Sequence, residues 1–135
     1  RINLNVSERD YSELFDKRLQ EIPSTLKVIK KLKRNYKLIL ISNTNKPNYD
    51  KVLSKSRAFK YFDKAVLSFK CGFLKPDFRI YLELIRSAGC EPSEILFIDD
   101  LKRNVDGAKK IGINGIQYKN YNQLVKVLKK YKVNL

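Results

Sequence analysis

The sequence predicts an α/β protein whose mostly parallel sheet is covered by helices on both faces. Two observations predict this fold. First, four short apolar runs alternate with segments in which apolar residues recur at helical spacing. Second, 135 residues with 43% hydrophobic content can build one buried core but hardly two domains. Short buried strands that alternate with helices are joined by right-handed crossovers, so neighbouring strands run parallel.

Two helices are predicted before the first strand. Ser7 and Asp10 form an S-x-x-D helix start, which predicts a polar helix to about residue 20. Pro23 suits the first turn of a second helix, in which Leu26, Ile29 and Leu32 recur every third residue.

Four strands and four further helices follow in alternation. The apolar runs that predict strands are residues 37–41, 64–69, 95–98 and 113–118. The predicted helices are a short one ending near Ser56, one that Gly89 closes, one over residues 102–111, and a lysine-rich one at the carboxyl end.

The composition excludes several classes of site. Because the sequence contains no histidine, Ser-His and Cys-His nucleophile pairs and histidine-ligated zinc sites are absent. Two cysteines, Cys71 and Cys90, make no disulfide framework and suit a reducing compartment. No apolar run approaches the roughly 18 residues of a membrane span, and the first residues contain no apolar signal core. We therefore expect a cytoplasmic protein with no membrane partner.

The net charge of +15 raises the question of a nucleic-acid partner. Lysine and arginine occupy six of the eleven positions 27–37 and four of the seven positions 126–132. Both runs lie on predicted helices whose apolar residues face inward, so we interpret them as solvated faces and nucleic acid as the less favoured partner. A positive field would also speed the arrival of anionic phosphate esters.

Polar side chains gather where the predicted strands end. Ser42 and Asn43 follow the first strand, Lys75 lies in the loop after the second, and Asp99 and Asp100 end the third. Each has a structural explanation on its own, as a helix cap, a turn or a solvated lysine. Ligands of such sheets, however, bind beyond the carboxyl ends of the strands, where these groups would meet.

Together these groups suit a phosphate dianion and a hard divalent cation. Lys75 would supply a positive charge to phosphoryl oxygens, while Ser42 and Asn43 would supply neutral donors. Asp100 offers the oxygen ligand that Mg²⁺ prefers, and Mg²⁺ needs only one or two carboxylates. The sequence thus predicts Mg²⁺ as the cofactor and a small phosphorylated metabolite as the partner, and it disfavours zinc.

Three segments carry a family resemblance. LILISNTN, GFLKPDFRIY and ILFIDDLKRNVDGAKKIGINGI resemble the second, third and fourth motifs of the haloacid dehalogenase (HAD) superfamily of phosphohydrolases, in the same order. The match covers about residues 24–119 and is closest to the branch of sugar-phosphate phosphatases and the N-terminal phosphatase domain of soluble epoxide hydrolase. The resemblance implies a Rossmann-like, three-layer α/β/α core over residues 23–135 and the end of a helical cap over residues 1–22.

The resemblance also implies roles for the residues that bind phosphate. Ser42 would hydrogen-bond the transferring phosphoryl group, and Asn43 would help to hold it. Lys75 would neutralise charge on that group and on an aspartyl-phosphate intermediate. These three residues are the expected phosphate site, with Ser42 and Lys75 taking part in catalysis.

The remaining roles concern the metal. Asp100 would ligate Mg²⁺, Asp99 would support the metal site or Lys75, and Asn104 would brace the loop. True haloacid dehalogenases lack this acidic pair, and in response regulators the acidic pair comes first in the chain. The resemblance therefore favours a phosphatase over both.

The family's first motif, D-x-D, occurs nowhere in this sequence. In the family it carries the nucleophile on a central strand, which would lie between the strands of residues 37–41 and 95–98. We therefore expect this chain to be inactive by itself and an upstream segment to hold the missing strand. Otherwise the two flanking strands close up, or a second copy fills the gap in a homodimer. A non-catalytic relative that retains the phosphate site is the alternative function.

Overall fold

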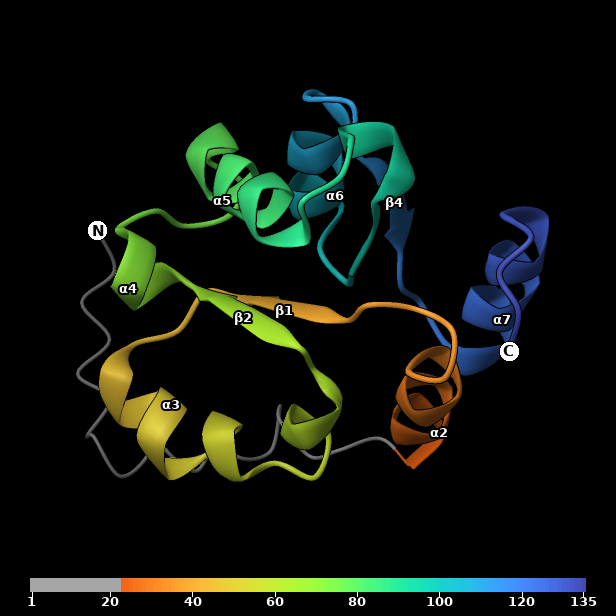
Figure 1. The fold of residues 1–135 in the computed structure, drawn as a ribbon, viewed down its shortest axis with the longest axis horizontal. Coiled ribbons are helices and arrows are strands. Elements are labelled where there is room, and N and C mark those ends of the chain that lie inside the picture. Colours follow the sequence, from red (N-terminus) through yellow and green to blue (C-terminus); the bar gives the residue numbers. More distant parts are fainter. Residues whose placement is uncertain (1–22) are drawn as a thin grey trace, which may run out of the picture.

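The computed structural model describes residues 23–135, which fold into helices and short strands in alternation (Figure 1). The predicted helix within residues 7–20 and the cap region of residues 1–22 lie outside the described residues. No helix in the described part is long and apolar enough to cross a membrane. The elements are α2 (Pro23–Leu32), β1 (Ile39–Ser42), α3 (Lys46–Lys51), β2 (Lys64–Leu67), α4 (Ser68–Cys71), α5 (Phe78–Ala88), β3 (Leu96–Asp99), α6 (Lys102–Lys109), β4 (Asn114–Gln117) and α7 (Tyr121–Lys130), with single 3₁₀ turns at Leu53–Lys55, Phe59–Tyr61 and Pro92–Glu94.

The strands form two parallel pairs. β1 pairs with β2, with Ser42 opposite Leu67 at its carboxyl end, and β3 pairs with β4, with Asp99 opposite Gln117. This confirms the predicted α/β class with parallel strands. β1 and β3 are not paired with each other in residues 23–135, so the two strands do not close up here. The arrangement is that of a Rossmann-like sheet from which a strand between β1 and β3 is missing.

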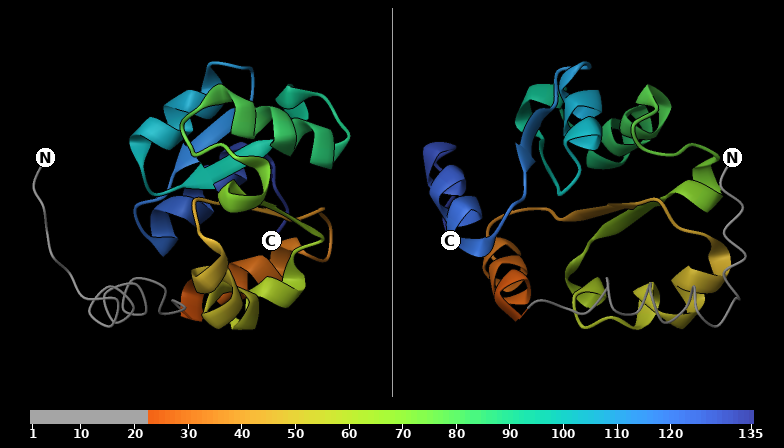
Figure 2. Two further views of the ribbon diagram at one scale, coloured as in Figure 1. Left: turned by 90° about the vertical axis from the view of Figure 1, so that its left-hand side faces the viewer. Right: turned by 180° about the vertical axis from the view of Figure 1, so that it is seen from behind.

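Helices cover the strands from two sides, as Figures 1 and 2 show. β3 alternates accordingly: Phe97 faces α5 and α6, whereas Leu96 and Ile98 face α2 and α7. The first core contains Val66, Ile80, Tyr81, Leu84, Phe97, Val105, Ala108 and Ile113. The second contains Val28, Leu32, Ile116, Leu124 and Leu128. Together the two cores give the three layers that the resemblance implies.

The second strand is shorter than predicted. The apolar run KAVLSF suggested a strand to Phe69, but β2 ends at Leu67 and α4 begins at Ser68. The cause is a polar contact that apolar spacing does not reveal. The buried Ser68 hydroxyl accepts from Thr44 N and donates to Thr44 O, both at 2.8 Å. These bonds hold the chain after β2 against the chain after β1.

Gly115 in β4 lies where α6 packs closely on the strand. A Cβ at this position would lie 2.7 Å from Val105 Cγ1, well inside van der Waals contact. Because the Val105 side chain is short and buried, we expect Gly115→Ala to lower the free energy of unfolding by about 1–3 kcal/mol, measured by urea denaturation. The double variant Gly115→Ala with Val105→Ala removes the clash, so it should lose less than the two single losses combined. If the loss of stability in the double variant equalled the sum of the two single losses, the contact between Gly115 and Val105 would not be tight.

Candidate functional site

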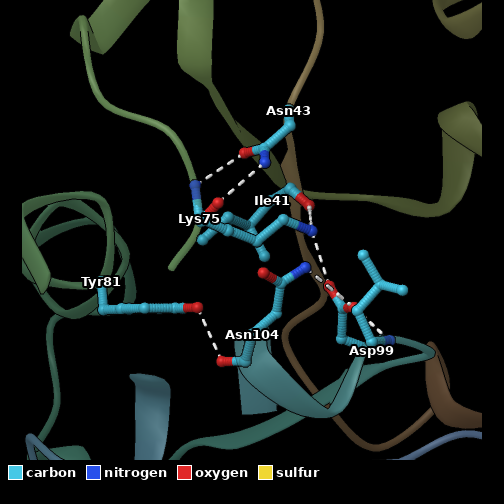
Figure 3. Close-up of polar contacts among 7 residues, drawn as sticks. Ile41, Asn43, Lys75, Tyr81, Asp99 and Asn104 are labelled. Atoms are coloured by element: carbon cyan, nitrogen blue, oxygen red, sulfur yellow. Dashed lines mark hydrogen bonds and ion pairs between the residues drawn. The ribbon is translucent and has the colours of Figure 1, made fainter. Parts of the chain in front are cut away.

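Lys75 connects the carboxyl ends of strands from the two sheets. It lies in the loop between α4 and α5, and its Nζ donates to Ile41 O in β1 at 3.2 Å and to Asp99 Oδ2 at the end of β3 at 2.7 Å. Figure 3 shows the side chain reaching between these two partners. The ammonium also lies 5.7 Å from the centroid of the Phe97 ring. Lys75 and Asp99, two of the groups predicted to meet at one edge, are therefore in contact there.

The ion pair between Lys75 and Asp99 is buried, with side chains 11% and 5% exposed. Such a pair needs further hydrogen bonds to offset its loss of hydration. Asp99 Oδ1 receives them from Leu101 N at 2.9 Å and Asn104 Nδ2 at 3.1 Å. Burial by itself raises the pKa of the Asp99 carboxyl, but the bonds from Lys75, Leu101 and Asn104 outweigh it and hold that pKa below its ordinary value.

Asn43 fixes the backbone of Lys75. Its Oδ1 accepts from Lys75 N at 2.8 Å, and its Nδ2 donates to Lys75 O at 3.1 Å (Figure 3). Both polar atoms of the amide are thus engaged with the loop. Ser42, by contrast, is the last residue of β1 and is half-buried beside Ile41. Asn43 therefore holds the Lys75 loop through two hydrogen bonds, whereas Ser42 lies at the end of the strand itself.

The two adjacent acids have different surroundings. Asp99 is buried and fully engaged, whereas Asp100 is exposed. Within residues 23–135 no hydrogen bond or ion pair to the Asp100 carboxylate is formed, and its backbone carbonyl accepts from Gln117 Nε2 at 3.1 Å. The structure thus pairs the Asp99 carboxylate with Lys75 and leaves the adjacent Asp100 carboxylate exposed.

These surroundings define what the described residues could offer a metal ion. No group of three or more Asp, Glu, His or Cys residues gathers in the described part of the chain. The oxygens of Asp99 are committed to Lys75, Leu101 and Asn104, so Asp100 is the carboxylate left for a cation. One carboxylate with water fits Mg²⁺, which keeps much of its hydration shell. The same donor set is too sparse for zinc.

Tyr81 completes the support of this site and is absent from the residues predicted from the sequence. The residue is fully buried, its hydroxyl donates to Asn104 O at 2.6 Å, and its ring meets that of Phe97 edge-on at 5.5 Å. Burial, together with the nearby Asp99 charge, raises the pKa of Tyr81 to about 12, so the phenol remains a donor at neutral pH. Its position beside Ile80 on the buried face of α5 is the signal that could have revealed it.

Comparison with known proteins gives a consistent result. Residues 3–118 match the family model described as haloacid dehalogenase-like hydrolase. Flavin mononucleotide hydrolase 1 of Arabidopsis thaliana is 34% identical over 87 residues, which cover 64% of this chain and 36% of the relative. D-ribitol-5-phosphate phosphatase of Bacteroides thetaiotaomicron is 32% identical over 98 residues, which cover 66% of this chain and 46% of the relative.

Solved structures agree with these matches. A wild-type HAD family enzyme from Bacteroides thetaiotaomicron, in complex with magnesium and inorganic phosphate, superposes with a TM-score of 0.66 at 30% identity. The match covers 76% of this chain and 56% of that enzyme. The matches therefore span about half, or less, of the length of these three relatives.

Proposed function

Because this chain belongs to the haloacid dehalogenase-like hydrolase family, we propose that the whole protein is a Mg²⁺-dependent phosphatase of small phosphomonoesters. The buried ammonium of Lys75, held between the ends of β1 and β3, is the observation that carries the proposal. Relatives named for ribitol 5-phosphate and flavin mononucleotide support a substrate in which phosphate is esterified to an alcohol.

The phosphate would bind at the carboxyl edge through Lys75 and Ser42. An ammonium has three N–H donors, and Lys75 uses two of them on Ile41 and Asp99. The third remains for a phosphoryl oxygen, while the Ser42 hydroxyl offers a neutral donor from the end of β1. Asn43 would keep the Lys75 loop in position rather than contact the phosphate through its amide.

Asp100 would hold the metal ion. When bound, Mg²⁺ would neutralise negative charge that develops on the phosphoryl oxygens. Asp99 supports this arrangement by holding Lys75 and by accepting from Asn104 in the first turn of α6. One solved neighbour is a complex with both magnesium and inorganic phosphate, which supports a site that binds the metal ion and the phosphate together.

The nucleophile would come from outside this sequence. We infer that a strand with a D-x-D motif precedes residue 1 and lies between β1 and β3, which are unpaired with each other in the described part. Its first aspartate would attack phosphorus and form an aspartyl-phosphate as the alcohol leaves, and water would then release phosphate. We expect the 135-residue chain alone to show little turnover.

The test uses the full-length protein and p-nitrophenyl phosphate. We expect hydrolysis that depends on added Mg²⁺ and stops with EDTA, and we expect Asp100→Asn to lower kcat about 100-fold or more. Asp50→Asn, at an exposed acid paired with Lys46, is the matched control and should retain activity. Undiminished hydrolysis in EDTA, or by the Asp100 variant, would contradict the assignment.

The missing D-x-D motif supports one alternative, a relative that binds phosphate without hydrolysing it. In that case the full-length protein would bind inorganic phosphate through Lys75 but release no p-nitrophenol. Isothermal titration of the wild-type protein with phosphate separates the two functions when read beside the hydrolysis assay, because only the alternative combines phosphate binding with an absence of hydrolysis.

A further inference from the structure

The fold joins two basic runs that lie about a hundred residues apart in the sequence. α2 and α7 lie side by side in every view (Figures 1 and 2) and share one apolar core. Asn134 N, beyond α7, also donates to the Tyr36 hydroxyl, beyond α2, at 3.0 Å. Both helices pack on the same side of the strands, against Leu96, Ile98 and Ile116, so their exposed sides point away from the strands and lie next to each other. We call this surface the basic face; its exposed members are Lys27, Lys30, Arg34, Lys126, Lys129 and Lys130.

The basic face lies in a part of the chain that contains no acids. Residues 22–49 and 107–135 carry 14 lysines and arginines and no aspartate or glutamate. The rest of the chain carries 15 basic and 14 acidic residues, so 14 of the 15 net positive charges reside in these two segments. Uniform compositional drift would not separate the charges in this way. Among the described residues, none of the six members of the basic face forms an ion pair.

We propose that the basic face binds the phosphate backbone of single-stranded nucleic acid. Considered one at a time, the two runs are solvated helix faces. Packed together, they bring six cations onto one surface, and none of these six is paired with a carboxylate among the described residues. Tyr131 follows directly after Lys130 and is 43% exposed, so its ring is available to stack on a base.

An acidic membrane is the less suitable polyanion for this face. Binding of a helix to a bilayer buries an apolar face in the interfacial region. On α2 and α7 the apolar positions Val28, Leu32, Leu124 and Leu128 are instead buried in the protein core. The surface therefore offers charge and an aromatic ring, which suits a strand of nucleotides. This site is separate from Lys75, which is buried at the carboxyl edge of the strands.

The experiment measures binding of a fluorescein-labelled 20-nucleotide single strand by fluorescence anisotropy at several salt concentrations. Six phosphate contacts on a single strand predict a slope of log K against log salt of about −4. We expect the triple variant Lys126→Gln, Lys129→Gln, Lys130→Gln to raise Kd about tenfold or more and to reduce the slope by about 2.

The matched control changes the net charge equally at another place. Lys51→Gln, Lys55→Gln, Lys70→Gln removes three exposed lysines at or beside α3, Lys70 lying over the Tyr49 ring of that helix, and should change Kd by no more than about twofold. Circular dichroism establishes that both triples are folded. Equal weakening by the two triples, a slope near zero, or binding to phosphatidylserine vesicles without binding to the oligonucleotide would overturn the proposal.

Discussion

Replacement of Lys75 with methionine is expected to lower the free energy of unfolding by about 3–5 kcal/mol. The substitution leaves the Asp99 carboxylate, whose side chain is 5% exposed, without the cation that neutralises it. Methionine keeps most of the volume of the lysine chain, so the loss would report the charge rather than a cavity. Urea denaturation followed by circular dichroism measures the change.

Two further variants separate this effect from a general loss of a lysine. Lys46→Met breaks the pair with Asp50, whose side chains are 70% and 50% exposed, and should cost less than about 1 kcal/mol. Adding Asp99→Asn to Lys75→Met removes the unpaired charge but keeps an acceptor for Leu101, so stability should recover in part. A loss for Lys75→Met no greater than that of Lys46→Met would contradict the buried pair.

The same pair predicts a pH dependence. The pKa of Asp99 is lower in the folded protein than its ordinary value of 3.8, so the folded state binds protons less readily than the unfolded state. Its contribution to stability is therefore fully present above that ordinary value and is lost as pH falls through the lowered pKa. We therefore expect the free energy of unfolding of Asp99→Asn, measured by urea denaturation at several acidic pH values, to fall less steeply with decreasing pH than that of the wild type.

Replacement of Tyr81 with alanine is expected to cost about 3–5 kcal/mol of unfolding free energy, because it empties a fully buried aromatic position. Tyr81→Phe keeps the ring against Phe97 and loses only the hydrogen bond to Asn104 O, so it should cost about 0.5–1.5 kcal/mol. Differential scanning calorimetry of the two variants separates the packing of the ring from the hydroxyl contact.

Leu82, the next residue on the same helix, supplies the control. It is 42% exposed, so Leu82→Ala should change stability by less than about 0.5 kcal/mol. If Tyr81→Phe lost as much stability as Tyr81→Ala, the hydroxyl rather than the ring would dominate. If Leu82→Ala were as harmful as Tyr81→Ala, the buried face of α5 would be assigned wrongly.

The periodic part of the fold could be predicted from the sequence. Apolar runs and helix caps give the order of strands and helices from residue 23 onward, because burial on both faces of a parallel sheet leaves a local signal. α5 shows the limit of that signal. YLELI has apolar residues on two sides, and apolar spacing alone does not tell that Tyr81 is buried while Leu82 is exposed.

The candidate site was predictable in its position but not in its contacts. Parallel strands bring Ser42, Lys75 and Asp99 to one edge, and that rule needs only the order of elements. Composition alone does not distinguish the two adjacent aspartates. The family resemblance implies that Asp99 supports the metal site or Lys75, and the structure pairs it with Lys75. The bonds of Asn43 to the loop depend likewise on a contact across 32 residues.

The two bonds between Asn43 and the backbone of Lys75 reproduce what a neighbouring peptide would offer: an acceptor for the N–H and a donor for the carbonyl. The loop that carries Lys75 therefore loses its conformational entropy when the protein folds, and not when an anion binds. An incoming phosphate would meet a preorganised cation, and the entropy of ordering that cation would not be subtracted from its affinity.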